Sequence, residues 1–144
     1  MTITVHNRQR RWRVDAQQLA RLAGRAVECI GNSQAELSIV LVSDRGMAPL
    51  NEQFHHVAGP TDILTFDYGD AGELIISVDH AVAQARRYRT KPSRELALYV
   101  VHGLLHLAGQ DDRTVAQRRK MRAAERLTLR KIDTGRIVWQ RQKT

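Results

Sequence analysis

The sequence has little cysteine, few aromatic side chains and no long uninterrupted apolar run. Cys29 is the only cysteine among 144 residues, so no internal disulfide can form, and a reducing cytoplasm is the expected location. The longest apolar stretch, residues 96–109, is interrupted by two histidines and is too short to span a bilayer. Residues 1–14 lack the apolar core of a signal peptide. We therefore expect a soluble, cytoplasmic protein with no membrane segment.

Acidic residues are scarce toward the C-terminal end. Residues 113–144 hold eleven Lys and Arg against two acidic residues, whereas residues 1–112 hold twelve against thirteen. The net charge of +8 therefore lies mostly in the last part of the chain, and a second basic cluster spans residues 8–13. This distribution suits a polyanion such as nucleic acid. A solvated helix face followed by a basic tail at about 131–144 explains it equally, so charge alone favours nucleic acid only weakly.

Hydrophobic periodicity predicts an α+β fold in one domain over residues 1–144. The length suits one domain, and no linker, repeat or low-complexity segment divides it. The predicted order is strand, helix, strand, helix, two strands and then three helices. We expect a mixed sheet of about four strands with helices packed around it. The expected strands are at residues 2–7, 37–42, 62–68 and 73–78.

Caps and glycines indicate where the helices begin and end. Gly31 and Gly109 are expected to end two of them, and the short helix of Leu50 and Phe54 is expected to begin near Pro49. Four polar residues precede helical patterns and are the expected N-caps: Asp15, Asp79, Ser93 and Thr114, the last with Gln117 in a capping box.

The helix that ends at Gly109 carries two histidines in an otherwise apolar run. His102 and His106 are four residues apart, so their side chains lie one turn apart on the same side. A buried imidazole needs partners for its ring nitrogens. One histidine could use a backbone carbonyl, but two in register favour a shared metal ion, and zinc-binding helices use this spacing.

A third ligand is expected just beyond this helix. Gly109 lets the chain turn, and Asp112 completes the pattern H-x-x-x-H-x-x-G-x-x-D. A loop or capping role is the alternative for Asp112. Asp111 is a rival ligand, although holding a ligating histidine in place suits it better. Three protein ligands with an open fourth position form the catalytic type of zinc site.

The residue after the first histidine argues against a metalloprotease. Enzymes with the H-E-x-x-H motif carry their general base there, but this sequence has Gly103. A glycine within a helix costs about 0.5–1 kcal/mol relative to alanine. We therefore expect that close packing requires the small residue.

Several blocks of the sequence together resemble one known family, the YbeY-type rRNA maturation endoribonucleases. The segment HGLLHLAGQDD resembles the family signature H-G-x-L-H-L-x-G-Y-D-H. LNEQF followed by GPTDILTF, then GELIISVDHA, and finally KMRAAE in the last helix are similar to further family blocks. The resemblance covers about residues 36–127 in consistent order and spacing.

The resemblance implies a compact α+β fold with a zincin-like helix and a metal-dependent, single-strand-specific endoribonuclease. The implied role is maturation of small-subunit rRNA, especially the 3′ end of 16S rRNA, and ribosome quality control. The implied partners are single-stranded rRNA, the small ribosomal subunit and one of its proteins. The implied cofactor is one divalent ion, usually zinc. His102 and His106 match metal-binding histidines, Asp112 takes the place of the third, and His55 takes the place of an arginine that faces the RNA phosphate.

Two of these positions depart from the family pattern. Asp112 adds a negative charge beside the metal, which weakens polarisation of bound water and widens the choice of metals to manganese. At position 55 an arginine would be permanently charged, whereas a histidine near pH 7 is mostly neutral unless an anion stabilises its charged form. His56 could share that role.

Other interpretations remain open from the sequence. The protein could bind rRNA without cutting it, hydrolyse another substrate class, or hold a structural metal with no open position. Asp62 and Asp67 could orient the site, although Asp62 is equally suited to capping a turn. Trp12 and Trp139 could stack on bases or simply pack.

Overall fold

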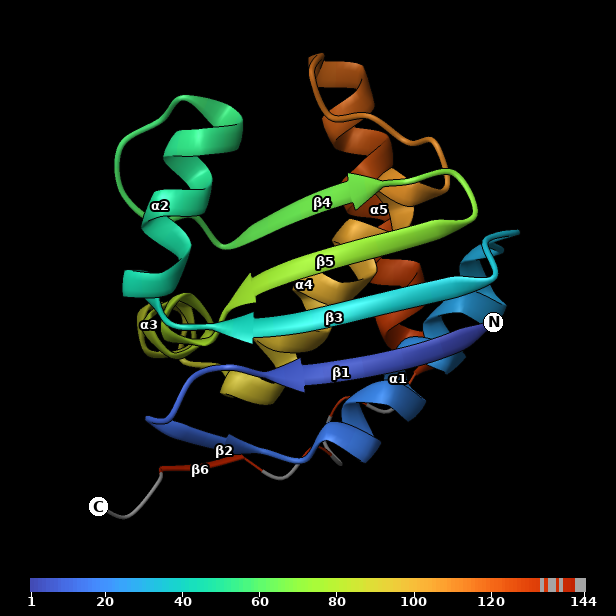
Figure 1. Cartoon of the computed structure of the whole chain (residues 1–144). Coiled ribbons are helices and arrows are strands. Elements are labelled where there is room, and N and C mark those ends of the chain that lie inside the picture. The colour runs from blue at the N-terminus through green and yellow to red at the C-terminus, as the bar shows by residue number, and fades with distance from the viewer. Residues whose placement is uncertain (133, 135–136, 138, 142–144) are drawn as a thin grey trace.

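A mixed four-stranded sheet organises the fold (Figure 1). The computed structural model describes residues 1–132, 134, 137 and 139–141. In the strand order β1-β3-β5-β4, the first three strands are parallel and β4 pairs antiparallel with β5, which confirms the expected mixed sheet. The strands are β1 Thr2–Asn7, β3 Glu36–Val42, β4 Ile63–Asp67 and β5 Ala71–Ser77.

Helices cover both faces of this sheet, as Figure 1 shows. The helices of the described residues are α1 Ala16–Ile30, α2 Asp44–His55, α3 Val78–Tyr88, α4 Pro92–Leu107 and α5 Val115–Lys131. The larger apolar cluster lies on the face covered by α1, α4 and α5. On the other face a smaller cluster packs against α2. In the described part of the chain, no helix is long and apolar enough to cross a membrane.

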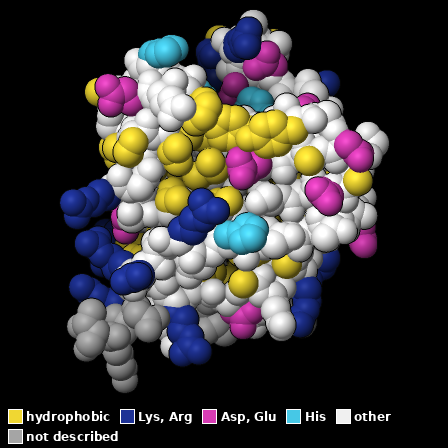
Figure 2. Space-filling model, viewed as in Figure 1, with side chains coloured by type: hydrophobic (Ala, Val, Ile, Leu, Met, Phe, Trp, Pro, Cys, Tyr) yellow, Lys and Arg dark blue, Asp and Glu magenta, His cyan; other side chains and the backbone are white. Residues whose placement is uncertain are grey.

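The smaller cluster leaves apolar side chains at the surface. Figure 2 shows them as a yellow patch over the sheet, beside α2. Phe54 is 47% exposed, and its ring meets that of Phe66 edge-on at 5.0 Å. Tyr68 stacks on Phe66 at 6.2 Å. This aromatic cluster lines the edge of the sheet at β4.

Gly103 explains how α4 approaches the sheet. A Cβ atom built at this position would lie 2.6 Å from Leu74 Cδ2 and 2.9 Å from Ile63 Cδ1. Those distances are shorter than any ordinary carbon–carbon contact. The expected need for a small residue is confirmed, and it arises from packing of α4 on β4 and β5.

Three predictions about helix starts are wrong. Helix α2 begins at Asp44, capped by the Ser43 hydroxyl, so Pro49 lies inside it and not near its start. Ser77, not Asp79, caps α3. The Asp79 carboxylate instead accepts a hydrogen bond from the Asp44 N–H at 2.8 Å.

The third error concerns α4. Pro92 already occupies the start of the helix, so Lys91 is the N-cap, and its side chain makes no capping hydrogen bond. Ser93 therefore lies within the first turn, where it is buried. The remaining caps are confirmed. Asp15 accepts from Gln18 N–H, and α5 begins with the capping box predicted at its N-terminus.

A small second sheet was not predicted. Strands β2 Trp12–Val14 and β6 Trp139–Arg141 pair antiparallel. The rings of Trp12 and Trp139 lie 6.2 Å apart, so both tryptophans pack against each other. Part of the predicted basic tail therefore forms a strand. The rest of that prediction, at residues 133, 135–136, 138 and 142–144, lies outside the described residues.

Candidate metal centre

The two histidines of α4 face each other across one helical turn. Their Nε2 atoms are 3.1 Å apart, and the rings meet edge-on at 79° with centroids 4.6 Å apart. Both side chains are partly buried. The i, i+4 spacing therefore brings two nitrogen ligands to one point, as the sequence predicted.

Asp112 joins them from the turn after α4. Gly109 has a φ of +97°, a conformation that glycine adopts without steric cost, and its N–H bonds to the His106 carbonyl at 2.9 Å. The chain then turns back toward the helix. Asp112 Oδ2 lies 3.5 Å from His106 Nε2 and 3.7 Å from His102 Nε2.

These spacings match those around a small divalent cation. Four tetrahedral ligands at about 2.0–2.1 Å from a zinc ion are about 3.3–3.4 Å from one another. The observed separations of 3.1, 3.5 and 3.7 Å lie around that value. The three ligand atoms, all within 4.8 Å of one another, therefore fit a metal with room for a fourth ligand.

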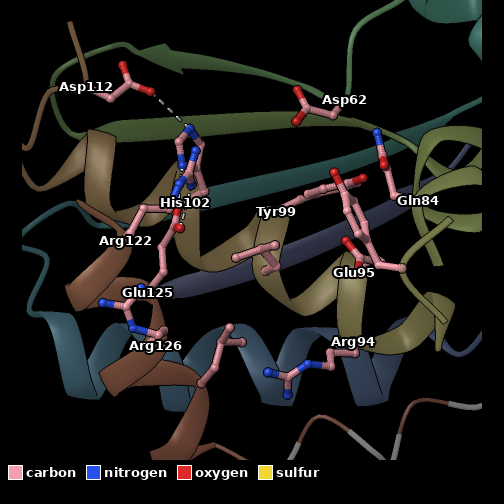
Figure 3. A pocket seen from close by; sticks show the side chains of 13 residues that line it. Asp62, Gln84, Arg94, Glu95, Tyr99, His102, Asp112, Arg122, Glu125 and Arg126 are labelled. Carbon is pink, nitrogen blue, oxygen red and sulfur yellow. Dashed lines mark hydrogen bonds and ion pairs between the residues drawn. The ribbon is translucent and has the colours of Figure 1, made fainter. Parts of the chain in front are cut away.

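Glu125, on α5, fixes the orientation of His102. Its Oε2 lies 2.7 Å from His102 Nδ1, and the residue is only 2% exposed (Figure 3). A carboxylate at this distance holds the proton on Nδ1, so that Nε2 presents its lone pair to a metal. Arg122 in turn donates to Glu125 Oε1 at 2.6 Å.

The same contacts keep Glu125 ionised. Burial by itself raises the pKa of this carboxyl group, but hydrogen bonds and charge from His102 and Arg122 outweigh burial and hold the pKa below its usual value. The anionic carboxylate can therefore accept a hydrogen bond from Nδ1–H of His102, which leaves Nε2 facing the metal cluster. The sequence contained Glu125 in the KMRAAE block, yet a contact between residues so far apart in the chain could not be derived from it.

Asp111 does not hold a histidine. Its Oδ1 accepts from the Asp112 N–H at 2.9 Å, and its Oδ2 lies 3.4 Å from Arg113 Nε. Within the described residues, no hydrogen bond or ion pair joins Asp111 to either histidine. Glu125 fills the position expected for Asp111, because α5 and not the turn lies against the Nδ1 side of His102.

His55 is not part of the cluster. It is the last residue of α2 and is exposed, and His56 caps the helix in the left-handed conformation. No hydrogen bond or ion pair among the described residues links His55 to the three ligands. Asp67 accepts from Gln34 Nε2 and from the Gly69 N–H, so it shapes a turn instead of the site.

A cleft of about 680 Å³ extends from the metal cluster between α3, α4 and α5. Figure 3 shows His102 and Asp112 toward one end and Asp62 and Gln84 toward the other. Three arginines line it, and a cleft with this lining can bind the phosphates of a polyanion. They are Arg94, Arg122 and Arg126.

The fold and site together define a class, that of α+β proteins with a cluster of two histidines and a carboxylate beside an arginine-lined cleft. The family model described as endoribonuclease YbeY matches residues 4–133. The chain belongs to this family.

Curated relatives named endoribonuclease YbeY are similar over most of the chain. The Anaeromyxobacter sp. (strain Fw109-5) protein is 34% identical over 132 residues, with 87% of this chain and 69% of the relative covered. The Moorella thermoacetica protein is 35% identical, with 90% and 96% covered. The fold is similar to the solution structure of TM1509 from Thermotoga maritima, at a TM-score of 0.65 and 24% identity, with 90% and 88% of the two chains covered.

Proposed function

We propose that this protein is a metal-dependent endoribonuclease that cuts single-stranded RNA during maturation of small-subunit rRNA, including the 3′ end of 16S rRNA. Membership in the family gives the reaction class, hydrolysis of RNA phosphodiester bonds. The observation that carries the metal dependence is the convergence of the ligand atoms of His102, His106 and Asp112 beside the cleft.

The three proposed ligands and their neighbours have different roles in this site. We assign the metal, zinc in our proposal, to His102, His106 and Asp112; when bound, such an ion acts as a Lewis acid and lowers the pKa of water. Glu125 keeps His102 in the tautomer that can bind it. Arg122 holds Glu125 and lines the cleft, where its charge can also attract a phosphate.

His55 is assigned to the substrate phosphate in this proposal. The support is its position in the block that resembles the family, together with its exposure at the end of α2. An RNA strand that leaves the metal cluster would have to pass α2 for this contact to form. The imidazole would donate to a phosphate oxygen and stabilise developing charge.

The cellular setting is also proposed. One domain over residues 1–144, acting in the cytoplasm on rRNA of the small ribosomal subunit, agrees with the net charge of +8 and with the lack of membrane-spanning helices in the described residues. A small-subunit ribosomal protein is the proposed protein partner.

The decisive experiment combines elemental analysis with RNA cleavage by the purified chain. We expect about one metal ion per chain and cleavage of single-stranded but not duplex RNA. The variant His102→Ala, His106→Ala should lose both, whereas His6→Ala, an exposed histidine on β1, should lose neither. Equal cleavage by the double variant and the natural chain would refute the enzyme proposal. Peptide cleavage instead of RNA cleavage would point to another hydrolase.

A further inference from the structure

The end of the cleft away from the metal cluster contains buried polar atoms without partners. Tyr99 is only 5% exposed, and its hydroxyl group makes no hydrogen bond to the described residues. Oε1 of Gln84, on α3, is likewise buried and unpartnered. Each such atom costs about 1–3 kcal/mol when it stays unpaired. Both line the cleft, so a ligand that enters it can pair with them (Figure 3).

Carboxylates complete this end of the cleft. Asp62 uses Oδ1 for both of its hydrogen bonds, from Ile63 N–H at 2.7 Å and Thr61 Oγ1 at 3.2 Å, and Oδ2 makes none within the described residues. Glu95 accepts from Thr90 through Oε1 alone. The far end is therefore rich in acceptors.

Tyr99 supplies the matching donor. Burial, followed by the negative charges of Asp62 and Glu95, raises the pKa of the Tyr99 hydroxyl above its usual value. The group keeps its proton at neutral pH and can donate a hydrogen bond. The pocket thus offers a neutral hydroxyl donor beside several acceptors.

We propose that Asp62, Gln84 and Tyr99 form a nucleobase pocket for the RNA strand cut at the metal cluster, and that guanine fits it best. This inference rests on the proposed function. Proteins read single-stranded RNA by hydrogen bonds to the Watson–Crick edges of unstacked bases. Guanine offers two adjacent donors, N1–H and N2–H, to the Asp62 carboxylate and the Gln84 amide, and O6 accepts from the Tyr99 hydroxyl. Uracil has one ring N–H between two carbonyl groups, which would face the carboxylates.

The charges around the pocket suit a nucleotide. Arg94 and Arg122 line the same cleft and can meet the backbone phosphates. The base would then point into the acceptor-rich end. One cleft accommodates both the backbone and a base in this arrangement.

The test uses single-stranded oligouridylates with one internal guanosine, inosine, adenosine or cytidine placed at successive positions. Inosine is the sharpest comparison because it lacks only the amino group of guanosine. We expect cleavage near guanosine to exceed cleavage near inosine or uridine by about tenfold, the effect of one or two hydrogen bonds. Equal rates for all five bases at every position would overturn the pocket while leaving the endoribonuclease intact.

Variants separate this pocket from a general loss of structure. Gln84→Ala should reduce the preference for guanosine over inosine to less than about threefold, and Tyr99→Phe should do the same for guanosine over adenosine, which lacks the O6 acceptor. Tyr68→Phe removes the hydroxyl of an exposed tyrosine on the opposite face of the sheet and should keep the preference. Tyr99→Phe should also unfold at the same or a higher urea concentration, because a buried unpartnered hydroxyl is removed. An undiminished guanosine preference in both pocket variants would contradict the assignment.

A binding measurement tests the pocket independently of RNA cleavage. Titration with the mononucleotides GMP, IMP and UMP, followed by NMR shifts of the Tyr99 ring and the Gln84 amide, should give GMP the highest affinity. If no oligonucleotide is cut but GMP still binds best, the endoribonuclease proposal fails and the pocket stands. Equal affinity of the three mononucleotides would refute the pocket itself.

Discussion

At the scale of single residues, the metal cluster depends on a carboxylate that is not itself one of the proposed metal ligands. Glu125 bonds to Nδ1 of His102, on the side of the ring opposite Nε2. It is almost fully buried, so the bond is shielded from water. Partners of this kind fix both the tautomer and the ring orientation of a ligating histidine. The position of one side chain on α5 thereby controls what α4 can bind.

We expect Glu125→Gln to weaken zinc binding by about 10- to 100-fold, because a neutral amide holds the Nδ1 proton less firmly than a carboxylate. Competition with a chromophoric chelator measures the affinity directly. Glu28→Gln, an exposed position on α1, is the matched control and should leave the affinity unchanged. Unaltered zinc affinity in Glu125→Gln would show that His102 needs no such partner.

At this site, residues close together in the sequence were predictable, whereas a contact between distant residues was not. His102, His106 and Asp112 lie within one helix and the turn after it, so spacing alone brought their side chains together. Glu125 comes from another helix, and the crossing of α4 and α5 decides its contact. Asp111, which the sequence favoured for that role, bonds instead to the Asp112 N–H and lies beside Arg113. A neighbour in sequence was preferred over a neighbour in space.

At the scale of elements, close packing of α4 on the sheet sets the position of the cluster. Gly103 lies between the two histidines in sequence and faces Leu74 and Ile63. Its missing side chain lets the helix axis approach β4 and β5. Since both histidines belong to the same helix, any displacement of α4 also moves the metal ligands.

Gly103→Ala is expected to destabilise the fold by about 1–3 kcal/mol, because the added methyl group overpacks the contact with Leu74 and outweighs the better helix propensity of alanine. Gly24→Ala in α1 is the matched control. Its Cβ would lie 3.8 Å from Ile3 Cδ1, an ordinary contact, so that variant should gain about 0.5–1 kcal/mol. Urea unfolding of both variants checks the pair, and a gain in Gly103→Ala would contradict the packing argument.

The elements were predictable to different degrees for physical reasons. Elements with a strong local pattern were found: β3 from its continuous run of apolar, β-branched residues and α1 from its helical spacing. The start of α3 was misplaced because Ser77 and Asp79 are both good caps, and Asp79 instead bonds to the backbone of α2. The sheet of β2 and β6 joins strands from opposite ends of the chain, a pairing that no local signal encodes.

At the scale of the whole molecule, the metal ligands are spatially distinct from the apolar clusters that stabilise the fold. The two apolar clusters lie between the helices and the sheet, and none of the three proposed metal ligands belongs to either. Figure 2 shows Lys and Arg around the margins of the face that carries the apolar patch and also directly below the patch. The cleft beside the metal cluster, by contrast, is lined by three arginines and by the acceptor-rich far end. Because the metal ligands lie outside both clusters, loss of a metal ion would leave the apolar core in place.

Removal of the metal should therefore abolish RNA cleavage without unfolding the protein. Loss of an ion present at 100 times its dissociation constant costs about 2.7 kcal/mol of stability, whereas a domain of this kind has about 5–15 kcal/mol in total. We expect a chelator to abolish RNA cleavage and to lower the urea midpoint, with the far-UV circular dichroism unchanged at zero urea. Added zinc should restore cleavage. If the chelator removes the helical signal, the ion is part of the structural core, and its coordination by three residues with an open position is refuted.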